Sequence, residues 1–364
     1  MNDAKVLTLS ARHPPRVLLA GAAGFIGSHL ADRLIGDGCH VIGVDNLITG
    51  SMQNLEHLRG HPRFRFIEQD VTEPLDIDAA LDWVMHFASP ASPPKYQHWP
   101  LRTLEANSRG THCLLELASR KRAGFFFAST SEVYGDPVQH PQCEQHWGNC
   151  NPNGPRSMYD EGKRYAEAAV MAYHRSRGLP VHIIRIFNTY GPRMDPDDGR
   201  VVATFIRQAL AGQPLSVFGD GRQTRSLQYI SDLVDGIVRY MHVDYTGPVN
   251  LGNPDECSVT DIALLVRRLT HSRSPLTHMA LPDDDPKRRC PDITLAKRLL
   301  GWSPKVSVEE GLIRTIKAYA DDLRGHATGP KSIIDVRVSD QSEEAAEPSL
   351  HRAGDTADQP GSRP

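Results

Sequence analysis

The chain has 364 residues, of which 39% are hydrophobic and 23% charged, and this is the ordinary composition of a soluble globular protein. Its formal net charge of −3 gives no electrostatic case for binding nucleic acid or a membrane surface. No apolar run approaches the roughly 20 residues that a membrane helix needs. Charged residues also interrupt the N-terminal stretch where a signal peptide would carry its hydrophobic core.

The cysteines and histidines indicate a reduced protein without a structural metal. The six cysteines lack the paired spacing of a metal site, and reduced thiols are typical of the cytoplasm. The 17 histidines form no His-x-x-x-His pair on a plausible helix. We therefore predict a cytoplasmic location and no metal site.

In the first half of the chain, short apolar runs alternate with amphipathic segments. The expected strands span residues 16–20, 40–44, 64–68, 83–88, 125–128 and 181–186. The expected helices between them span residues 25–36, 103–120 and 159–177. This alternation predicts an α/β fold with a doubly wound parallel Rossmann sheet. Ligands of such sheets bind beyond the C-terminal ends of the strands.

After residue 187 the alternation weakens. Short strands are expected at 215–218 and 248–251, and helices at 201–211, 232–242 and 260–269. We predict a Rossmann domain at 16–187 and a smaller C-terminal substrate-binding domain mainly at 188–323, with a segment near 227–252 returning to the Rossmann sheet. Residues 1–15 are expected to form a flexible arm. The polar composition of residues 324–364 predicts a disordered tail.

A glycine-rich turn connects the first expected strand to the first expected helix. Gly21, Gly24 and Gly27 allow a tight turn, close approach of a pyrophosphate and close packing of helix on strand. Asp45 ends the next strand, where a carboxylate accepts hydrogen bonds from a ribose 2′-hydroxyl and repels a 2′-phosphate, so NAD is favoured over NADP. Asp70 is expected either near the adenine or as a surface acid. The predicted NAD site comprises Gly21, Gly24, Phe25, Ile26, Gly27, Asp45, Asn46, Asp70 and Val71.

A tyrosine and a lysine one helical turn apart indicate an oxidation site. Tyr159 and Lys163 share a face of their helix. A tyrosine with an ordinary pKa of about 10 is a poor base at neutral pH, but a nearby ammonium and the cationic nicotinamide favour its phenolate. Thr130, at the end of the fifth expected strand, is placed to hold the substrate hydroxyl. We predict that Tyr159, Lys163 and Thr130 are catalytic and that the first two also contact the cofactor.

With these motifs, residues 16–322 resemble the extended short-chain dehydrogenases/reductases that act on nucleotide sugars, and within them the UDP-glucuronate decarboxylases. The SPASPP loop at 89–94 and the YDEGKR run at 159–164 are specific, whereas the glycine turn is shared by the whole superfamily. The segments that carry the resemblance are residues 87–96, 130–137 (TSEVYGDP), 151–164, 185–193 (RIFNTYGPR), 198–202 (DGRVV), 219–229 and 284–292.

The resemblance implies NAD-dependent conversion of UDP-glucuronate to UDP-xylose through oxidation at carbon 4, loss of carbon dioxide, protonation at carbon 5 and reduction at carbon 4. Related 4,6-dehydratases carry an aspartic acid where this chain has Ser131, which cannot protonate a leaving hydroxyl well. Related 4-epimerases usually carry small residues at the position of Glu132. Three alternatives stay open: a UDP-sugar 4-epimerase, an oxidative decarboxylase that releases a 4-keto pentose, and a catalytically silent NAD-binding protein.

The resemblance also assigns Glu132 and Arg289 to decarboxylation and reprotonation, although Arg289 as a plain surface charge is the alternative. Glu132 follows Thr130 by two positions, so in an extended strand end both side chains project toward the sugar. Guanidinium groups suit diphosphate oxygens, while the uracil wall at 217–218 is equally compatible with simple packing. The implied substrate ligands are Tyr96, Asn188, Arg193, Val217, Phe218, Arg225 and Arg289.

A homodimer is expected from two helices that carry apolar or small residues on more than one face, since such a helix usually packs on both. The resemblance implies a two-fold interface of these helices. The residues on which the dimer prediction depends are Leu114, Leu115, Leu117, Ala166, Ala169 and Val170.

Near Asn107 the chain departs from the relatives that it resembles, because Glu105-Ala106 stands where they have a Lys-Thr pair.

Overall fold

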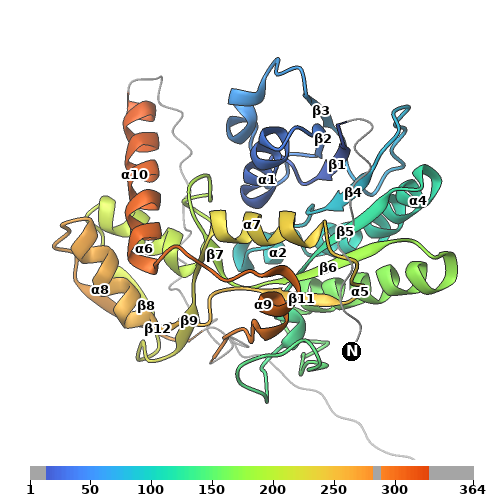
Figure 1. Cartoon of the computed structure of the whole chain (residues 1–364). Coiled ribbons are helices and arrows are strands. Elements are labelled where there is room, and N and C mark those ends of the chain that lie inside the picture. The colour runs from blue at the N-terminus through green and yellow to red at the C-terminus, as the bar shows by residue number, and fades with distance from the viewer. Residues whose placement is uncertain (1–13, 282–287, 328–364) are drawn as a thin grey trace, which may run out of the picture. The chain divides into compact units, whose positions relative to one another are not determined.

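A computed structural model describes residues 14–281 and 288–327, and its described residues up to Arg324 form one compact unit (Figure 1). Most of the predicted arm at 1–15 and of the predicted tail at 324–364 lies outside the described residues, so both stay predictions. Residues 324–327 continue the last helix, α10 (Val308–Ala327), and are not irregular as the tail prediction required.

Seven parallel strands form the central sheet in the order β11-β6-β5-β4-β1-β2-β3. The crossovers run to both sides of β1, which confirms the predicted doubly wound parallel sheet. Each strand of the predicted set is present, with ends that shift by two residues or fewer. Their bounds are β1 Arg16–Ala20, β2 His40–Asp45, β3 Phe64–Glu68, β4 Trp83–His86, β5 Gly124–Thr130, β6 Val181–Ile186 and β11 Pro248–Leu251.

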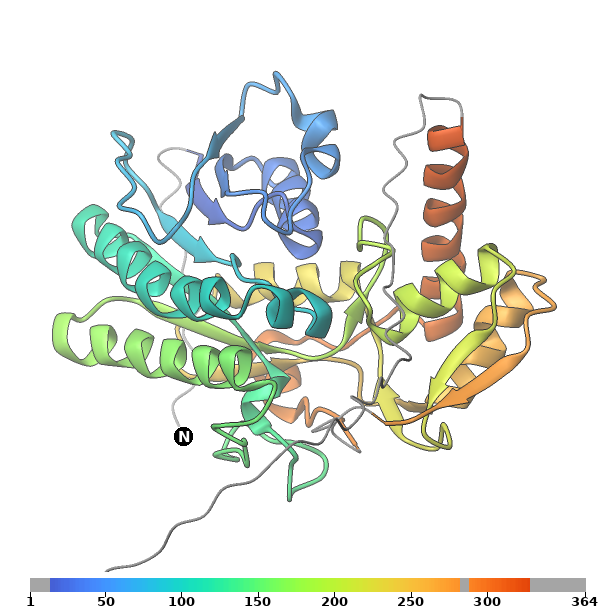
Figure 2. The same ribbon diagram turned by 180° about the vertical axis from the view of Figure 1, so that it is seen from behind.

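Helices cover both faces of the sheet, and alternate side chains of β1 show how. Val17 and Leu19 belong to the core shared with α1 (Phe25–Gly36) and α7 (Ile230–Tyr240). Leu18 and Ala20 belong to the core shared with α4 (Thr111–Lys121) and α5 (Ser157–Arg177), which lie side by side in Figure 2. Burial on both faces explains why β1 reads as a continuous apolar run.

The expected single helix at 103–120 is wrong in one respect, because a π-turn interrupts it. The observed order is α3 (Pro100–Glu105), η2 (Ala106–Gly110) and α4. Asn107 within η2 donates hydrogen bonds to the Thr103 carbonyl at 2.8 Å and to the Ser89 hydroxyl at 2.9 Å. The π-turn therefore aims a polar side chain at the SPASPP loop, and such turns are frequent at functional sites.

The second half of the chain adds helices and three two-stranded sheets beside the central sheet. Its apolar residues join the same core cluster as α1 and α7, while β11 returns to pair with β6. The bounds in the second half are β7 Thr189–Tyr190, α6 Val201–Leu210, β8 Leu215–Phe218, β9 Thr224–Ser226, β10 Gln228–Tyr229, β12 Glu256–Ser258, α8 Val259–Leu269, β13 Leu276–Met279 and α9 Thr294–Leu300. The remaining elements of the first half are η1 Met52–Leu58, α2 Pro93–His98 and η3 Ser131–Tyr134.

Two general features accompany this fold. Among the described residues, none of the helices combines the length and the apolar character needed to cross a membrane. All six cysteines lie in the described part of the chain, and each is a free thiol. The cytoplasmic location stays a prediction.

The residues that motivated the dimer prediction are buried within the chain itself, in the core beneath α4 and α5. They therefore do not provide the second apolar face that the prediction assumed. The apolar side chains that these helices and α3 leave in solvent are different ones: Leu101 is 71% exposed, Leu104 39% and Tyr165 47%. The homodimer stays a prediction, now carried by these exposed groups.

We expect the chain to sediment as a dimer at micromolar concentration and Leu104→Asp to sediment as a monomer, because a charge in an apolar interface loses its hydration without gaining a partner. Analytical ultracentrifugation checks this. Leu264→Asp on α8 is the matched control, since Leu264 is 40% exposed and lies outside the predicted interface. A parent protein that sediments only as a monomer would contradict the prediction.

Candidate active site

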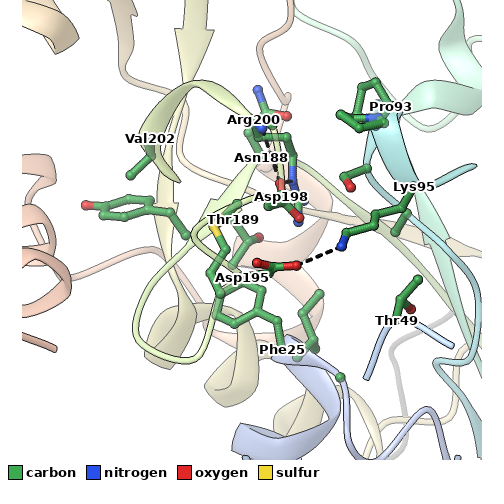
Figure 3. Close-up of a pocket in the computed structure, with 18 of the residues that line it drawn as sticks. Phe25, Thr49, Pro93, Lys95, Asn188, Thr189, Asp195, Asp198, Arg200 and Val202 are labelled. Carbon is green, nitrogen blue, oxygen red and sulfur yellow. Dashed lines mark hydrogen bonds and ion pairs between the residues drawn. The ribbon is translucent and has the colours of Figure 1, made fainter. Parts of the chain in front are cut away.

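A cleft of about 1030 Å³ opens at the C-terminal ends of β1, β4, β5 and β6, and segments from the second half of the chain form its other wall (Figure 3). It brings together most of the side chains predicted from the sequence. A smaller hollow of about 70 Å³ adjoins it, shares Gly21 and Gly24 with it and is lined by Asp45, Asn46, Asp70 and Val71. The predicted residues that line the main cleft are Gly21, Gly24, Phe25, Ile26, Gly27, Tyr96, Thr130, Glu132, Tyr159, Lys163, Asn188, Arg193, Phe218, Arg225 and Arg289.

The glycine turn has the geometry that a dinucleotide needs. Gly21 has a φ of +83°, and a Cβ there would lie 2.6 Å from the carbonyl carbon of Phe87. A Cβ on Gly27 would collide with the carbonyl oxygen of Gly21. Gly24 begins α1 without a side-chain cap, so the first N–H groups of the helix are available to a phosphate. This cradle fits the pyrophosphate of NAD.

Asp45 lines the smaller hollow and is bonded to the backbone of the glycine turn. Its carboxylate accepts hydrogen bonds from the Ala23 N–H at 3.0 Å and the Leu47 N–H at 2.9 Å. Burial raises the pKa of Asp45, and these N–H groups oppose that effect. Asn46 donates to Asp70 at 2.9 Å, which joins two other residues of the predicted NAD site. Asp45 therefore presents an acceptor-only group where the ribose hydroxyls of NAD would lie.

We expect Asp45→Ala to weaken NAD binding by about tenfold or more, because a hydrogen bond to a charged group contributes roughly 1.5–3 kcal/mol. The preference for NAD over NADP should narrow, since the repulsion of a 2′-phosphate is lost with the charge. Titration of both proteins with each cofactor checks this. Asp37→Ala, at the exposed end of α1, is the control. Equal affinity of the parent for NAD and NADP would contradict the assignment.

Tyr159 lines the cleft, and its ring stacks on that of Tyr96 at 5.1 Å between centroids and 6° between planes. Burial raises the pKa of Tyr159 well above its ordinary value, while a hydrogen bond with Thr130 and the charge of Arg200 oppose this. The Nζ of Lys163 donates to the Ala128 carbonyl at 2.9 Å and lies 5.9 Å from the Tyr159 ring centroid. Arg200 is therefore a second cation, besides the predicted Lys163, whose charge favours the phenolate of Tyr159. The catalytic role of Lys163 stays a prediction.

Burial also lowers the pKa of Lys163 to about 7, so the ammonium of Lys163 is only partly protonated at neutral pH.

Arg200 was not among the predicted site residues, although it lies in one of the segments that carry the resemblance, the DGRVV run. Its guanidinium pairs with Asp198, with Nη2 2.8 Å from the carboxylate, just before α6 begins. The sequence signal that could have identified Arg200 was its place in the DGRVV run, two residues after Asp198.

Glu132 lies between two arginines. Its carboxylate contacts Arg156 at 2.6 Å and also pairs with Arg289. Burial alone raises the pKa of Glu132, but the guanidinium groups of Arg289 and Arg156 hold it at about 2. Glu132 is therefore ionised at every working pH. Arg156 was also missed, and it lies in the same segment as Tyr159.

Two sequence expectations about this cluster need correction. Glu132 does not continue an extended strand, because β5 ends at Thr130 and residues 131–134 form the 3-10 turn η3. The Thr130 hydroxyl accepts the Glu132 N–H at 3.2 Å and caps that turn. Arg289 is not a plain surface charge, since it is only 3% exposed and its Nη2 donates to the Gly135 carbonyl at 3.2 Å.

Asp160 is a second buried carboxyl beside this cluster. Burial is the main effect that raises its pKa, to about 7, and the charge of Glu132 acts in the same direction, whereas Arg156 and Arg289 oppose it. One of its oxygens is buried without a hydrogen-bond partner in the described residues. Asp160 is therefore the carboxyl of this region that carries a proton near neutral pH.

Because the folded-state pKa of Asp160 is above the ordinary value of 3.8, stability is highest below that value and is lost as the pH rises toward 7. Asp160→Asn should therefore melt at a higher temperature than the parent at pH 8, with a smaller difference at pH 5. Each kcal/mol corresponds to roughly 2–4 °C. Thermal unfolding of Asp160→Asn and of the control Glu161→Gln checks this. Equal shifts at both pH values would contradict it.

Among the predicted substrate ligands, two differ from expectation. The Arg193 guanidinium donates to Asp32 of α1 at 2.7 Å. Arg193 therefore lines the cleft and also connects its own loop to α1. Val217 is fully buried in the core and does not line the cleft, which leaves Phe218, 38% exposed, as the cleft-facing member of that pair. The Tyr96 hydroxyl is buried without a hydrogen-bond partner in the described residues, and Tyr96 is among the residues that line the cleft. Its contact with the sugar stays a prediction.

One group of potential metal ligands exists among the described residues, away from the cleft. Ligand atoms of His140, Glu256 and Cys290 lie within 4.8 Å of one another. The guanidinium of Arg288 approaches His140 at 2.8 Å and Glu256 at 3.3 Å, and burial raises the pKa of Cys290. An arginine and a neutral thiol make this a poor cation site.

Comparison with known proteins points to the same class of enzyme as the residues of the cleft do. A sequence model of the family described as GDP-mannose 4,6 dehydratase matches residues 18–315. UDP-glucuronic acid decarboxylase 1 of Xenopus tropicalis is 51% identical over 319 residues, which cover 88% of this chain and 75% of that protein. UDP-glucuronic acid decarboxylase 5 of Arabidopsis thaliana is 52% identical over 298 residues, which cover 82% and 87%.

Among solved structures, the UDP-glucuronic acid 4-epimerase of Bacillus cereus, in complex with UDP-glucuronic acid and NAD, superposes with a TM-score of 0.75. It is 30% identical and covers 84% of this chain and 99% of its own. The enzyme character and the nucleotide-sugar relationship predicted from the sequence are confirmed by these likenesses. The chain belongs to the extended short-chain dehydrogenase/reductase family of nucleotide-sugar enzymes, in the branch of the UDP-glucuronic acid decarboxylases.

Proposed function

We propose that this protein decarboxylates UDP-glucuronate to UDP-xylose with NAD. The observation that carries the proposal is the ion-paired cluster of Arg156, Glu132 and Arg289 in the same cleft as Tyr159. The names of relatives about half identical to the chain support the same substrate and reaction.

The chain's own groups fit NAD, with the glycine cradle for the pyrophosphate and Asp45 for the adenosine ribose. When bound, NAD accepts a hydride from carbon 4 and later returns it. Tyr159 takes the proton of the 4-hydroxyl, and Thr130 and Arg200 favour its phenolate. Tyr159 gives the proton back when carbon 4 is reduced. The cycle is therefore redox neutral.

Between these steps the carboxylate at carbon 5 is β to a ketone, so the carbon–carbon bond breaks with its electrons entering an enolate. Arg289 is a buried, preorganised cation that stabilises this developing negative charge. Glu132 holds Arg289 in place and orients water or the sugar. Because the pKa of Glu132 is about 2, Glu132 is not itself the proton donor. Carbon 5 then receives one proton from a group in exchange with solvent.

Two other reactions share the first step. A 4-epimerase would return the hydride to the opposite face of carbon 4, and no carbon dioxide would be lost. Because the fold resembles that of a UDP-glucuronic acid 4-epimerase, the experiment below also distinguishes this reaction. An oxidative decarboxylase would release the 4-keto pentose and NADH. Ser131 argues against a dehydratase, because its hydroxyl lies 3.5 Å from the Arg289 guanidinium and is no acid for a leaving hydroxyl.

Incubation with UDP-glucuronate and NAD in heavy water, followed by NMR of the products, tests the proposal. We expect carbon dioxide and UDP-xylose, with one deuterium at carbon 5 and hydrogen retained at carbon 4. UDP-galacturonate would instead show the epimerase. Stoichiometric NADH with a 4-keto pentose would show the oxidative enzyme, and solvent label at carbon 4 would overturn the return of the same hydride.

A further inference from the structure

Two segments that line the cleft meet each other, and we name them the α2 lip (Pro93–His98) and the loop lip (residues 191–200). We call the place where they meet the mouth of the cleft. The Nζ of Lys95 lies 2.9 Å from the carboxylate of Asp195, and Figure 3 shows this ion pair between the two labelled side chains. Beside it, Pro94 packs so closely on Gly199 that a Cβ on Gly199 would collide with the proline ring. Residues of both lips line the cleft.

Each lip is also held by contacts of its own. The loop lip is tied to α1 through Arg193 and Asp32 at 2.7 Å, and to α10 through the Tyr319 hydroxyl, which donates to the Met194 carbonyl at 2.7 Å. The α2 lip is held by Tyr96, whose ring is buried against Tyr159. The ion pair that joins the lips is open to solvent, because its side chains are 33% and 40% exposed. Salt can therefore reach the junction between the lips.

The proposed cycle makes retention of its intermediate important. A complete cycle converts UDP-glucuronate and one proton to UDP-xylose and carbon dioxide. If the cleft opens after carbon dioxide is lost and carbon 5 is protonated, the 4-keto pentose escapes, and one NADH remains for each molecule released. Both outcomes balance in atoms and electrons, so what separates them is whether the sugar stays bound until the hydride returns.

We infer that the Lys95–Asp195 ion pair determines product specificity: by holding the α2 lip against the loop lip, it retains the 4-keto pentose until carbon 4 is reduced. This inference rests on the proposed function. An exposed ion pair shifts an equilibrium by roughly two- to fivefold at most. The expected change in product ratio is therefore about two- to fivefold, and not a loss of activity.

Charge reversal tests the inference directly. Lys95→Asp and Asp195→Lys each place like charges across the mouth, while the double reversal restores an ion pair with opposite polarity. The control is Glu309→Lys, which breaks an exposed ion pair with Arg268 at 2.9 Å, outside the residues that line the cleft. The first readout is the ratio of NADH to UDP-xylose after incubation with UDP-glucuronate and NAD.

The second readout does not depend on turnover. The release rate of bound UDP can be followed by tryptophan fluorescence, because Trp99 directly follows the α2 lip and is 39% exposed. We expect each single reversal to raise both the NADH ratio and the UDP release rate by about two- to fivefold. High salt should raise both in the parent, since salt screens exposed charges, and the double reversal should bring both back toward the parent values.

The outcomes separate the two claims. A parent that makes UDP-xylose while the single reversals keep its product ratio and UDP release rate overturns the inference and leaves the proposed function standing. A double reversal as leaky as the single ones also overturns it, because Lys95 would then act by direct contact with the anionic substrate. A parent that makes no UDP-xylose contradicts the proposed function itself.

Discussion

Tyr159→Phe is expected to slow the turnover of UDP-glucuronate by about 10²–10⁴-fold, the usual effect of removing an acid–base group. The phenolic oxygen is the proposed base, and the phenyl ring alone can still stack on Tyr96 at 5.1 Å. Binding of NAD should survive, since the glycine cradle lies on a different segment. Single-turnover reduction of NAD, with a cofactor titration alongside, measures both effects.

The same helix offers a matched control for this variant. Tyr165→Phe makes the identical change on α5 at a position that is 47% exposed, and its hydroxyl contacts His112 and not the cleft. It should turn over like the parent. Turnover of Tyr159→Phe within about tenfold of the parent would remove Tyr159 from the proposed mechanism.

The second large effect is expected at Glu132. Glu132→Ala should reduce the release of carbon dioxide by about 10²-fold or more while leaving NAD binding little changed. The substitution leaves Arg156 and Arg289 without the carboxylate that lies between them, so Arg289 loses the partner that holds it in place. Labelled carbon dioxide from UDP-glucuronate provides the measurement.

Glu132→Gln refines the test because it keeps the shape and removes the charge. If Glu132 acts by positioning Arg289, the glutamine variant should be nearly as slow as alanine, because an amide does not form the ion pair. Since the pKa of Glu132 is about 2, the parent's activity above pH 5 should show no titration from this group. Carbon dioxide release by Glu132→Gln at the parental rate would contradict the role.

The strands were predictable from sequence because burial on both faces leaves a simple mark. In β1, all of Val17 to Ala20 are fully buried, and an uninterrupted apolar run is the direct result. The glycine turn was equally readable, because Gly21 and Gly27 occupy positions where any side chain would collide with backbone. Requirements of this kind act on single residues, so they are visible in a single sequence.

What could not be predicted depends on contacts between distant segments. The π-turn at η2 forms where Asn107 reaches Ser89, and helical periodicity contains no information about that bond. Arg200 meets Tyr159 only because the chain returns to the cleft after β7. The buried position of Arg289 likewise requires Gly135, far away in the sequence, to accept its hydrogen bond. Such pairings are properties of the fold and not of any local pattern.

The late return of β11 to the sheet has a consequence for how the chain matures during synthesis. Pro248–Leu251 pairs with residues 183–186 of β6, so β6 stays an edge strand with unpaired backbone groups until about residue 251 has left the ribosome. Exposed edges of this kind promote aggregation. A fragment ending at residue 187 would contain the glycine turn and the tyrosine–lysine pair, yet it would lack the strand that completes its sheet. Nascent chains of intermediate length are therefore the ones that should need chaperones most.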